Sequence, residues 1–331
     1  MDADNNSQVP DGSWVLKPGV DPNSYSFAAS KWSKPYNIYL GGTAVRPALV
    51  SFKGRLYLFY SSGTGVDNAI YDGHKWDPLL SDFIINMPTR QGVSAVAVND
   101  SRLIVMAADT KTNQILLNWT DDGVNMHKEI NLGYTAQSAP SLVSYGNKVV
   151  AVFKSSDGTA LKMMECPDPI NRIDAWTQPV LISTSSAYSN RSPMACLYTD
   201  RLFMVFTDQN QYNRFTQAIY NFASNSWEYF SEDAFHPIRE NLQTDTVPGL
   251  ATIHGQLVMV YGNQFRDQLW YAASINGKWS INAALPFNIK TEAPPALAHH
   301  QGKLYCVFAN KDKATKWMDR QMHCTVFDPA S

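Results

Sequence analysis

The fold is decided by one stretch of the sequence, Pro47-Ala48-Leu49-Val50-Ser51-Phe52-Lys53-Gly54-Arg55-Leu56-Tyr57-Leu58-Phe59. Two apolar runs flank Lys53-Gly54, and this pair suits a two-residue hairpin turn. Pro47 suits the first residue of a strand, where its missing N–H costs no hydrogen bond of the sheet. The second run is apolar without alternation, which indicates a strand covered on both faces. The stretch therefore predicts a strand, a tight turn and a second strand.

The same pattern occurs six times along the chain. Aligned on its leucine, it needs no gap over the nine preceding residues in any copy. The aligned positions are Leu56, Leu103, Val149, Leu202, Leu257 and Leu304, at spacings of 46 to 55 residues. Nine residues earlier stand Pro47, Ser94, Pro140, Pro193, Pro248 and Pro295. Turn-forming residues stand two positions before the leucine, namely Gly54, Ser101, Asn147, Asp200, Gly255 and Gly302.

Each copy also predicts two further strands. The third strand is expected over residues such as 68–71 and 268–272, and the fourth opens near a tryptophan. These tryptophans are Trp76, Trp176, Trp227 and Trp279, with Met126 in the second copy, and their recurrence indicates packing between blades. Four strands in about fifty residues is the length of a propeller blade.

The two ends of the sequence complement each other. The sixth copy ends at Phe327-Asp328 after its third strand, while Ser30-Lys31-Trp32-Ser33 resembles Gly277-Lys278-Trp279-Ser280 of the fifth copy. The N-terminal segment is therefore expected to supply the last strand and to leave no long exposed edge. We predict an all-β, six-bladed β-propeller with four strands per blade, closed by the N-terminal strand. Residues 1–24 are expected to be an N-terminal extension, and 25–331 a single propeller domain.

Composition excludes several classes of function. The net charge is −2 and the sequence has no run of Lys and Arg, which argues against a nucleic-acid partner. No apolar stretch is long enough to cross a bilayer, so we expect no membrane insertion. The N-terminus lacks the features of a signal peptide, so the chain is either made without one or is a mature form, and its compartment stays open. Neither a cofactor motif nor a metal motif is present, and the oligomeric state is not encoded in any pattern.

The four cysteines show no metal-ligand spacing. Cys196 and Cys306 lie inside apolar strand patterns, which favours buried free thiols. A disulfide between Cys306 and Cys324 on neighbouring strands is the alternative.

A first candidate site follows from the symmetry of the repeat. Three residues before each first strand stand Ala44, Gln91, Gln137, Asn190, Asp245 and Glu292, of which five are polar. Symmetry places them in a ring at the mouth of the central channel, with Arg46 and Arg191 close to the same level. Such a ring would either grip a polar ligand or simply hydrate the mouth of the channel.

A second candidate site lies at the start of the third strand. Asp67, Asn68 and Tyr71 occur there in the first copy, and Asp267, Gln268 and Trp270 in the fifth. Carboxylates and amides bind sugar hydroxyls while an aromatic face stacks on the ring, so the combination suits a glycan. Turn-stabilising aspartates and core aromatics are the alternative interpretation. Trp317 in the sixth copy has no tryptophan equivalent and offers a further stacking surface.

The repeat resembles the blades of β-propeller lectins from bacteria and fungi. The resemblance rests on Pro295-Ala296-Leu297-Ala298 with Gly302-Lys303-Leu304-Tyr305, and on Asp267-Gln268-Leu269-Trp270-Tyr271 with Asn276-Gly277-Lys278-Trp279-Ser280. It extends from Lys31 to Phe327. It implies a non-catalytic lectin whose partners are glycans or glycoproteins, bound in pockets between blades or on the loop face, where several sites add avidity.

A weaker resemblance connects the chain to six-bladed sialidases. Arg46-Pro47-Ala48-Leu49 is similar to their first strand, where an arginine binds the substrate carboxylate, and Trp119-Thr120-Asp121-Asp122-Gly123-Val124-Asn125-Met126 is similar to a degenerate Asp-box turn. The arginine abuts the proline directly, and no Tyr/Glu nucleophile pair is evident. This alternative implies a glycoside hydrolase. Repeat symmetry, rather than the resemblance, offers Asp245 and Glu292 in adjacent blades as its carboxylate pair. A protein-binding scaffold or toxin subunit is the third class that a propeller allows.

Overall fold

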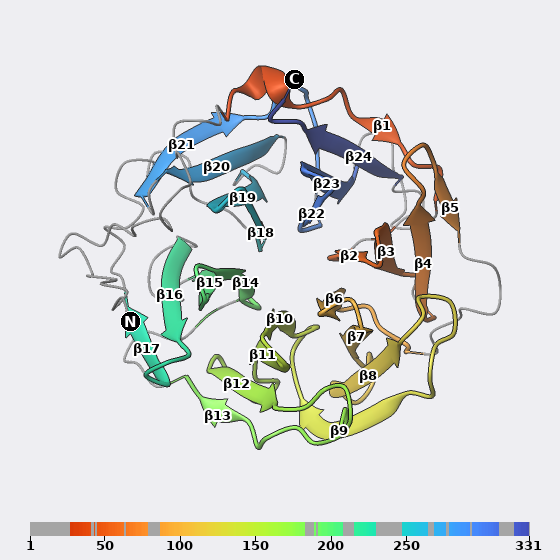
Figure 1. The fold of residues 1–331 in the computed structure, drawn as a ribbon, viewed down its shortest axis with the longest axis vertical. Helices are drawn as coiled ribbons and strands as arrows, with labels where there is room; N and C mark the ends of the chain where they lie inside the picture. Colours follow the sequence, from red (N-terminus) through yellow and green to blue (C-terminus); the bar gives the residue numbers. More distant parts are fainter. Residues whose placement is uncertain are drawn as a thin grey trace, which may run out of the picture.

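The computed structural model describes most of the chain, namely residues 27–40, 43, 45–62, 64–78, 87–182, 189, 191–207, 215–229, 247–263, 268–275, 278–291, 293–310 and 321–330. Within these residues the chain forms six antiparallel four-stranded sheets arranged in a ring, as shown in Figure 1. The predicted six-bladed β-propeller is therefore confirmed. The domain boundary expected at residue 24 lies outside the described residues.

Each sheet is one blade, and its first strand lies nearest the ring centre (Figure 1). Blade 1 consists of β2 (Ala48–Phe52), β3 (Arg55–Ser61), β4 (Val66–Tyr71) and β5 (Trp76–Pro78). Blade 2 consists of β6 (Val93–Val98), β7 (Arg102–Ala108), β8 (Gln114–Thr120) and β9 (Ile130–Thr135). Blade 3 consists of β10 (Ser141–Tyr145), β11 (Lys148–Lys154), β12 (Leu161–Cys166) and β13 (Val180–Leu181). Blade 4 consists of β14 (Met194–Tyr198), β15 (Arg201–Thr207), β16 (Phe215–Asn221) and β17 (Ser226–Tyr229). Blade 5 consists of β18 (Gly249–Ile253), β19 (Gln256–Gly262), β20 (Leu269–Ile275) and β21 (Lys278–Ala284). Blade 6 consists of β22 (Ala296–His300), β23 (Lys303–Ala309), β24 (Met322–Phe327) and β1 (Tyr36–Asn37).

The core consists of hydrophobic layers between the blades. Six clusters of buried residues are found among the described residues, one at each junction of neighbouring blades. In β3, for example, Leu56 and Leu58 pack toward blade 6, while Tyr57 and Phe59 pack toward blade 2. Both faces of the second strand are thus buried, which explains its apolar sequence without alternation.

The turns between first and second strands follow the prediction in five blades. Two residues separate the paired strand ends there, as at Lys53 and Gly54, whose φ angles are 48° and 72°. Blade 2 differs, because Val98 pairs with Arg102 and three residues form the turn. Asn99 and Asp100 both take positive φ, a conformation that Asn and Asp tolerate better than most residues. The expected two-residue turn is therefore wrong for this copy.

The repeated tryptophans pack between blades, as predicted. Trp76, Trp176 and Trp279 are buried in three different junctions. Their relation to the fourth strand is less regular than expected. Trp176 precedes β13 by several residues, and its indole N–H donates to the carbonyl of Ile173 at 2.8 Å. Met126 likewise precedes β9, so the fourth strands of blades 2 and 3 do not open at the expected residues.

The N-terminal segment closes the ring. Tyr36 and Asn37 of β1 pair with Cys324 and His323 of β24, so β1 is the outermost strand of blade 6. Trp32 is 3% exposed and forms an isolated bridge with Phe327. It packs into the junction of blades 5 and 6. The predicted closure is confirmed. Figure 1 shows β1 beside β24, with β5 of blade 1 following on the rim.

All four cysteines are free thiols, as the sequence predicted. Cys306 pairs in register with Thr325 rather than with Cys324, so the alternative disulfide is absent. Burial raises the pKa of the Cys196 thiol to about 12, which keeps it protonated and unreactive near neutral pH.

Candidate functional site

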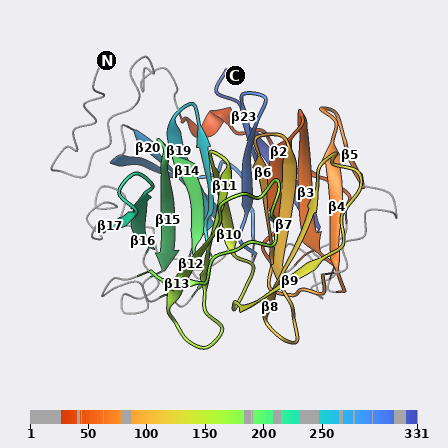
Figure 2. The ribbon, with the colours of Figure 1, turned by 60° about the horizontal axis from the view of Figure 1, so that its bottom comes forward.

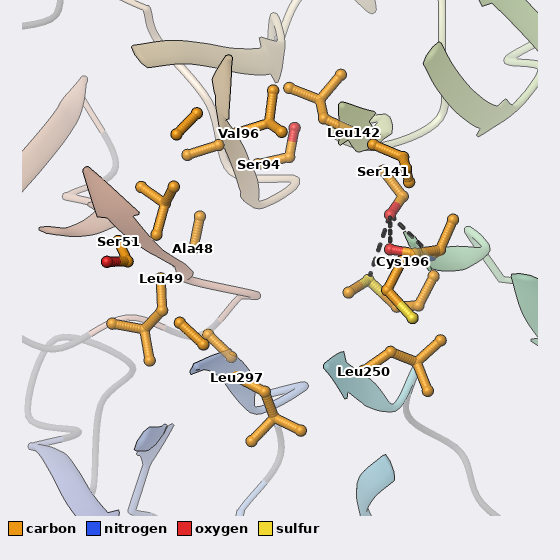
Figure 3. A pocket seen from close by; sticks show the side chains of 18 of the residues that line it. Ala48, Leu49, Ser51, Ser94, Val96, Ser141, Leu142, Cys196, Leu250 and Leu297 are labelled. Carbon is orange, nitrogen blue, oxygen red and sulfur yellow. Dashed lines mark hydrogen bonds between the residues drawn. The ribbon is translucent and has the colours of Figure 1, made fainter. Parts of the chain in front are cut away.

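A cavity of about 420 Å³ occupies the centre of the ring, where the first strands of all six blades meet. Each of these strands is the last strand of its sheet on that side, so each presents a free edge to the cavity. Figure 3 shows Leu142, Leu250 and Leu297, from three different blades, around its open centre. In Figure 2 the strands stand steeply, so turns and connections lie at the two ends of the ring. The channel therefore has two ends, one where the first strands begin and one where they end.

Arg46 lies at the end of the channel where the first strands begin. Its side chain is buried, and one terminal nitrogen donates to the carbonyl oxygens of Ala139 at 2.9 Å and Pro140 at 3.3 Å. The other terminal nitrogen lies 2.7 Å from the Sδ of Met194. Arg46 thus reaches from blade 1 to blades 3 and 4. Arg46 lines the central cavity, and its role as a ligand contact stays a prediction.

The rest of the predicted ring is only partly described. Arg191 is exposed. The pKa of the neighbouring Lys154 is lowered mainly by the burial of Lys154 and further by the positive charge of Arg191. Gln91 donates to the side chain of Asn113 at 2.9 Å, and Gln137 is exposed. Ala44, Asn190, Asp245 and Glu292 lie outside the described residues, so the proposed carboxylate pair stays a prediction.

Two histidines lie at the opposite end of the channel, at the end of β22. His299 lines the cavity, and Nδ1 of the buried His300 lies 2.9 Å from the hydroxyl of Ser51 on β2. Burial lowers the pKa of both imidazoles, and each is lowered further by a neighbouring histidine, His254 for His299 and His299 for His300. Both histidines are therefore held in the neutral form.

This arrangement predicts a loss of stability in acid. Above the ordinary histidine pKa of about 6.5, His300 is neutral in the folded and the unfolded chain, so its full contribution to the free energy of unfolding is present. As the pH falls below that value, the unfolded chain binds a proton that the folded protein does not, so the free energy of unfolding decreases. We expect the melting temperature of His300→Gln to fall less than that of the wild type when the pH is lowered from 7.5 to 5.5. Thermal denaturation followed by circular dichroism measures this difference. Parallel curves for the two proteins would show that His300 does not titrate on unfolding.

The first-copy residues of the second candidate site do not converge. Asp67 and Asn68 lie at the start of β4, but neighbouring side chains of a strand face opposite sides, and only that of Asp67 is exposed. Tyr71 ends the strand, roughly 13 Å from Asp67 at about 3.3 Å per residue. Its ring lies against Trp76, with centroids 5.3 Å apart. The structure thus separates Tyr71 from Asp67.

The fifth-copy residues lie near the start of β20. The side chain of Gln268 donates to the carbonyl of Leu285 at 3.5 Å, and Trp270 is half-buried against the cluster between blades 4 and 5. Asp267 and Trp317 lie outside the described residues. The role of all these residues as glycan ligands stays a prediction.

An aromatic patch on the closing strand was missed by the sequence reasoning. Among the described residues the most exposed large apolar side chains include two tyrosines, Tyr36 at 38% and Tyr39 at 89%, and both belong to the segment that closes the ring. The backbone N–H of Tyr39 donates to the side-chain oxygen of Asn37 at 2.7 Å, and the amide of Asn37 donates to Gln321 at 2.5 Å. We call Asn37, Tyr39 and Gln321 the rim patch. The side chain of Tyr36 faces the other side of β1, toward Cys324 and Trp76.

The backbone of Tyr39 has an unusual conformation. Its φ angle is 54°, a left-handed value that is uncommon for a bulky residue. Such a conformation persists only where the surrounding structure imposes it, and here the hydrogen bond to Asn37 holds it. The sequence signal for this site was Tyr-Asn-Ile-Tyr at residues 36–39. Whether these tyrosines are exposed depends on which strand edge the segment joins.

The Asp-box-like turn has a structural role. The carboxylate of Asp122 accepts the backbone N–H groups of Val124 and Asn125, both at 2.8 Å, and the hydroxyl of Thr120 at 2.9 Å. These hydrogen bonds hold the pKa of Asp122 far below its usual range. The carboxylate therefore stabilises the connection between β8 and β9.

The described part of the chain contains no group of three or more His, Cys, Asp or Glu side chains placed to hold a metal ion. Within the same residues, no helix has the length and apolar character required to span a membrane.

The sequence matches no protein-family model and no curated protein. Solved structures with the same fold are nevertheless found. An α-L-arabinanase of Penicillium chrysogenum in complex with arabinobiose is 12% identical, with a TM-score of 0.61 over 91% of this chain and 99% of that one. The SapL1 lectin in complex with α-methyl fucoside is 13% identical, with a TM-score of 0.59 over 83% and 91%.

The Hadza microbial sialidase Hz136 is also similar, at 13% identity and a TM-score of 0.61 over 88% of this chain and 68% of that one. These similar structures are thus carbohydrate-binding or carbohydrate-active propellers. The likeness confirms the expected resemblance to propeller lectins and to the sialidase fold, and at these identities it shows the fold alone.

Proposed function

We propose that the protein is a lectin that binds glycans and does not cleave them. The observation that carries this proposal is the rim patch, where the side chain of Tyr39 is 89% exposed and its backbone N–H donates to the amide of Asn37, which in turn donates to the amide of Gln321. An exposed aromatic ring offers a stacking surface, because sugar rings present C–H faces that stack on aromatics while amides bind their hydroxyls. The similar lectin bound to a fucoside supports the same conclusion.

The described candidate residues at the start of the third strands are assigned to the same function. Asp67 offers a carboxylate at the surface of the protein, and neighbouring groups that partly shield it from water raise its pKa. Tyr60 lies opposite Asp67 in the sheet. Asn68, Gln268 and Trp270 are close to the same ends of their strands. We propose that such residues line further pockets on the loop face or between blades, so that several weak sites together attach the protein to a glycan surface.

The first experiment combines a glycan array with a panel of chromogenic glycosides. We expect retention on a subset of glycans and no release of chromophore. Release of chromophore that is abolished by Asp245→Asn or Glu292→Gln would instead support the glycoside hydrolase. This second candidate is favoured by the similar arabinanase and sialidase structures. Silence in both assays would favour a protein partner, as for a scaffold or toxin subunit.

The rim patch gives a sharper prediction. Tyr39→Ala should weaken binding to the best glycan of the array by about 1–3 kcal/mol, because a stacking platform is lost. Its melting temperature should stay unchanged, since the side chain is 89% exposed. Titration calorimetry with the wild type, Tyr39→Ala and Tyr39→Phe measures this, and Tyr39→Phe should retain most of the affinity. Equal affinities of Tyr39→Ala and the wild type would remove Tyr39 from the site.

A further inference from the structure

The central cavity has an aliphatic collar in its middle part. Each blade contributes one residue to this collar, at the position of the first strand that pairs with the residue two positions after the aligned leucine position of the second strand. The six residues all line the cavity and are Leu49, Ala95, Leu142, Ala195, Leu250 and Leu297. Figure 3 shows the four leucines of the collar around the open centre. The middle of the channel is therefore lined by aliphatic side chains.

The collar is wider at blades 2 and 4 than at the other four blades. Ala95 and Ala195 each lack the isobutyl branching of the leucine that stands at the same position in blades 1, 3, 5 and 6. The four leucines are only 5% to 8% exposed, because they also pack into the junctions between blades. Blades 2 and 4 flank blade 3, so the two small side chains leave room on both sides of Leu142.

Hydroxyl groups lie next to the collar, toward the end of the channel where the first strands end. Two residues further along the first strands, on the same face and roughly 7 Å away, stand Ser51, Ser144, Thr252 and His299. All four line the cavity. Within the described part of the chain, the hydroxyls of Ser144 and Thr252 form no hydrogen bond, and both residues are half-buried. This level of the channel therefore offers hydroxyls to a polar group that lies beside an apolar wall.

We propose that the central channel binds a neutral straight-chain alcohol, with its alkyl chain inside the collar and its hydroxyl at Ser144 and Thr252. Apolar cavities take up small apolar molecules, because aliphatic side chains offer water no hydrogen-bond partner. The cavity volume of about 420 Å³ is within the range of small-molecule sites, roughly 300–1,000 Å³. The ligand carries no charge and needs no contact with Arg46. The site faces the interior of the ring, and it is independent of glycan binding at the rim patch.

The test uses the full chain with labelled leucine methyl groups and 1-hexanol as the probe, followed by nuclear magnetic resonance. The methyl signals of the four collar leucines should shift and saturate. Affinity should rise about fourfold for each added methylene from 1-butanol to 1-hexanol, since each buried methylene adds transfer free energy. Shifts that never saturate, or that are confined to the exposed Leu181, would overturn the proposal.

Three variants connect binding to the collar. Ala95→Leu places in blade 2 the leucine of four other blades, fills the wider part of the collar and should weaken 1-hexanol binding at least tenfold. Ala223→Leu makes the same change at an exposed turn and should leave the affinity unchanged. Thr252→Val keeps the shape of the side chain, removes its hydroxyl and should weaken binding about fivefold. Circular dichroism checks folding, and if Ala95→Leu does not fold, Thr252→Val decides. Unchanged affinity in a folded Ala95→Leu or in Thr252→Val contradicts the proposal, whatever the outcome of the glycan array.

Discussion

Deleting residues 1–40 should abolish the cooperative unfolding transition of the propeller. The deletion removes Trp32 and Phe27 from the junction of blades 5 and 6, and it removes β1 from the edge of β24. Loss of one large buried aromatic side chain costs roughly 3–5 kcal/mol. Two such losses are comparable to the whole net stability of a domain, about 5–15 kcal/mol. The exposed edge of β24 should also promote aggregation.

Single substitutions provide the matched comparison. Trp32→Ala should lower the melting temperature strongly, whereas Tyr39→Ala in the same segment should leave it unchanged, because Trp32 is 3% and Tyr39 is 89% exposed. Thermal denaturation followed by circular dichroism and light scattering measures both effects. A truncated chain that melts at the temperature of the full chain would show that the N-terminal segment does not close the ring.

Trp279→Ala should be the most damaging single substitution at the junction of blades 4 and 5. Trp279 is 1% exposed, and its indole N–H donates to the side-chain oxygen of Gln217 at 3.1 Å. Truncation opens a cavity that costs about 3–5 kcal/mol of the free energy of unfolding. Denaturant unfolding measures this loss.

Two further variants separate packing from other effects. Trp279→Phe keeps most of the apolar contact and should cost less than the alanine variant. Trp270→Ala, at a half-buried position beside the same cluster, tests whether that tryptophan is structural or binds a glycan. A lower melting temperature with unchanged affinity would make Trp270 structural. Equal stability of Trp279→Ala and the wild type would contradict the account of the junction.

The fold was accessible from the sequence because each blade repeats the same local signals. Proline before a strand, a turn pair, and an apolar second strand recur in order, and the displaced Trp32 indicated how the ring closes. The failure in blade 2 is instructive. Asn99 takes the aligned position of Phe52, and it leaves the strand to join the turn, since Asn tolerates positive φ. An apolar position occupied by asparagine was the available signal.

The candidate sites were less accessible, because they depend on contacts between distant parts of the chain. Arg46 contacts Ala139 and Met194, which lie 93 and 148 residues away. Residue types alone do not show that its side chain is buried or that it reaches across the channel. The start of the third strand illustrates a different limit. Asp67 and Tyr71 are close in sequence, but an extended strand places them at opposite ends.

The most direct test of glycan binding without cleavage is one nuclear magnetic resonance sample. It contains the wild-type protein and the best glycan from the array, and it is followed for a day. We expect saturation transfer from the protein to the sugar protons, strongest at the face that stacks on an aromatic ring, and an unchanged glycan spectrum. New anomeric signals of a released reducing end would show that the protein is a hydrolase. Absence of saturation transfer would contradict glycan binding itself.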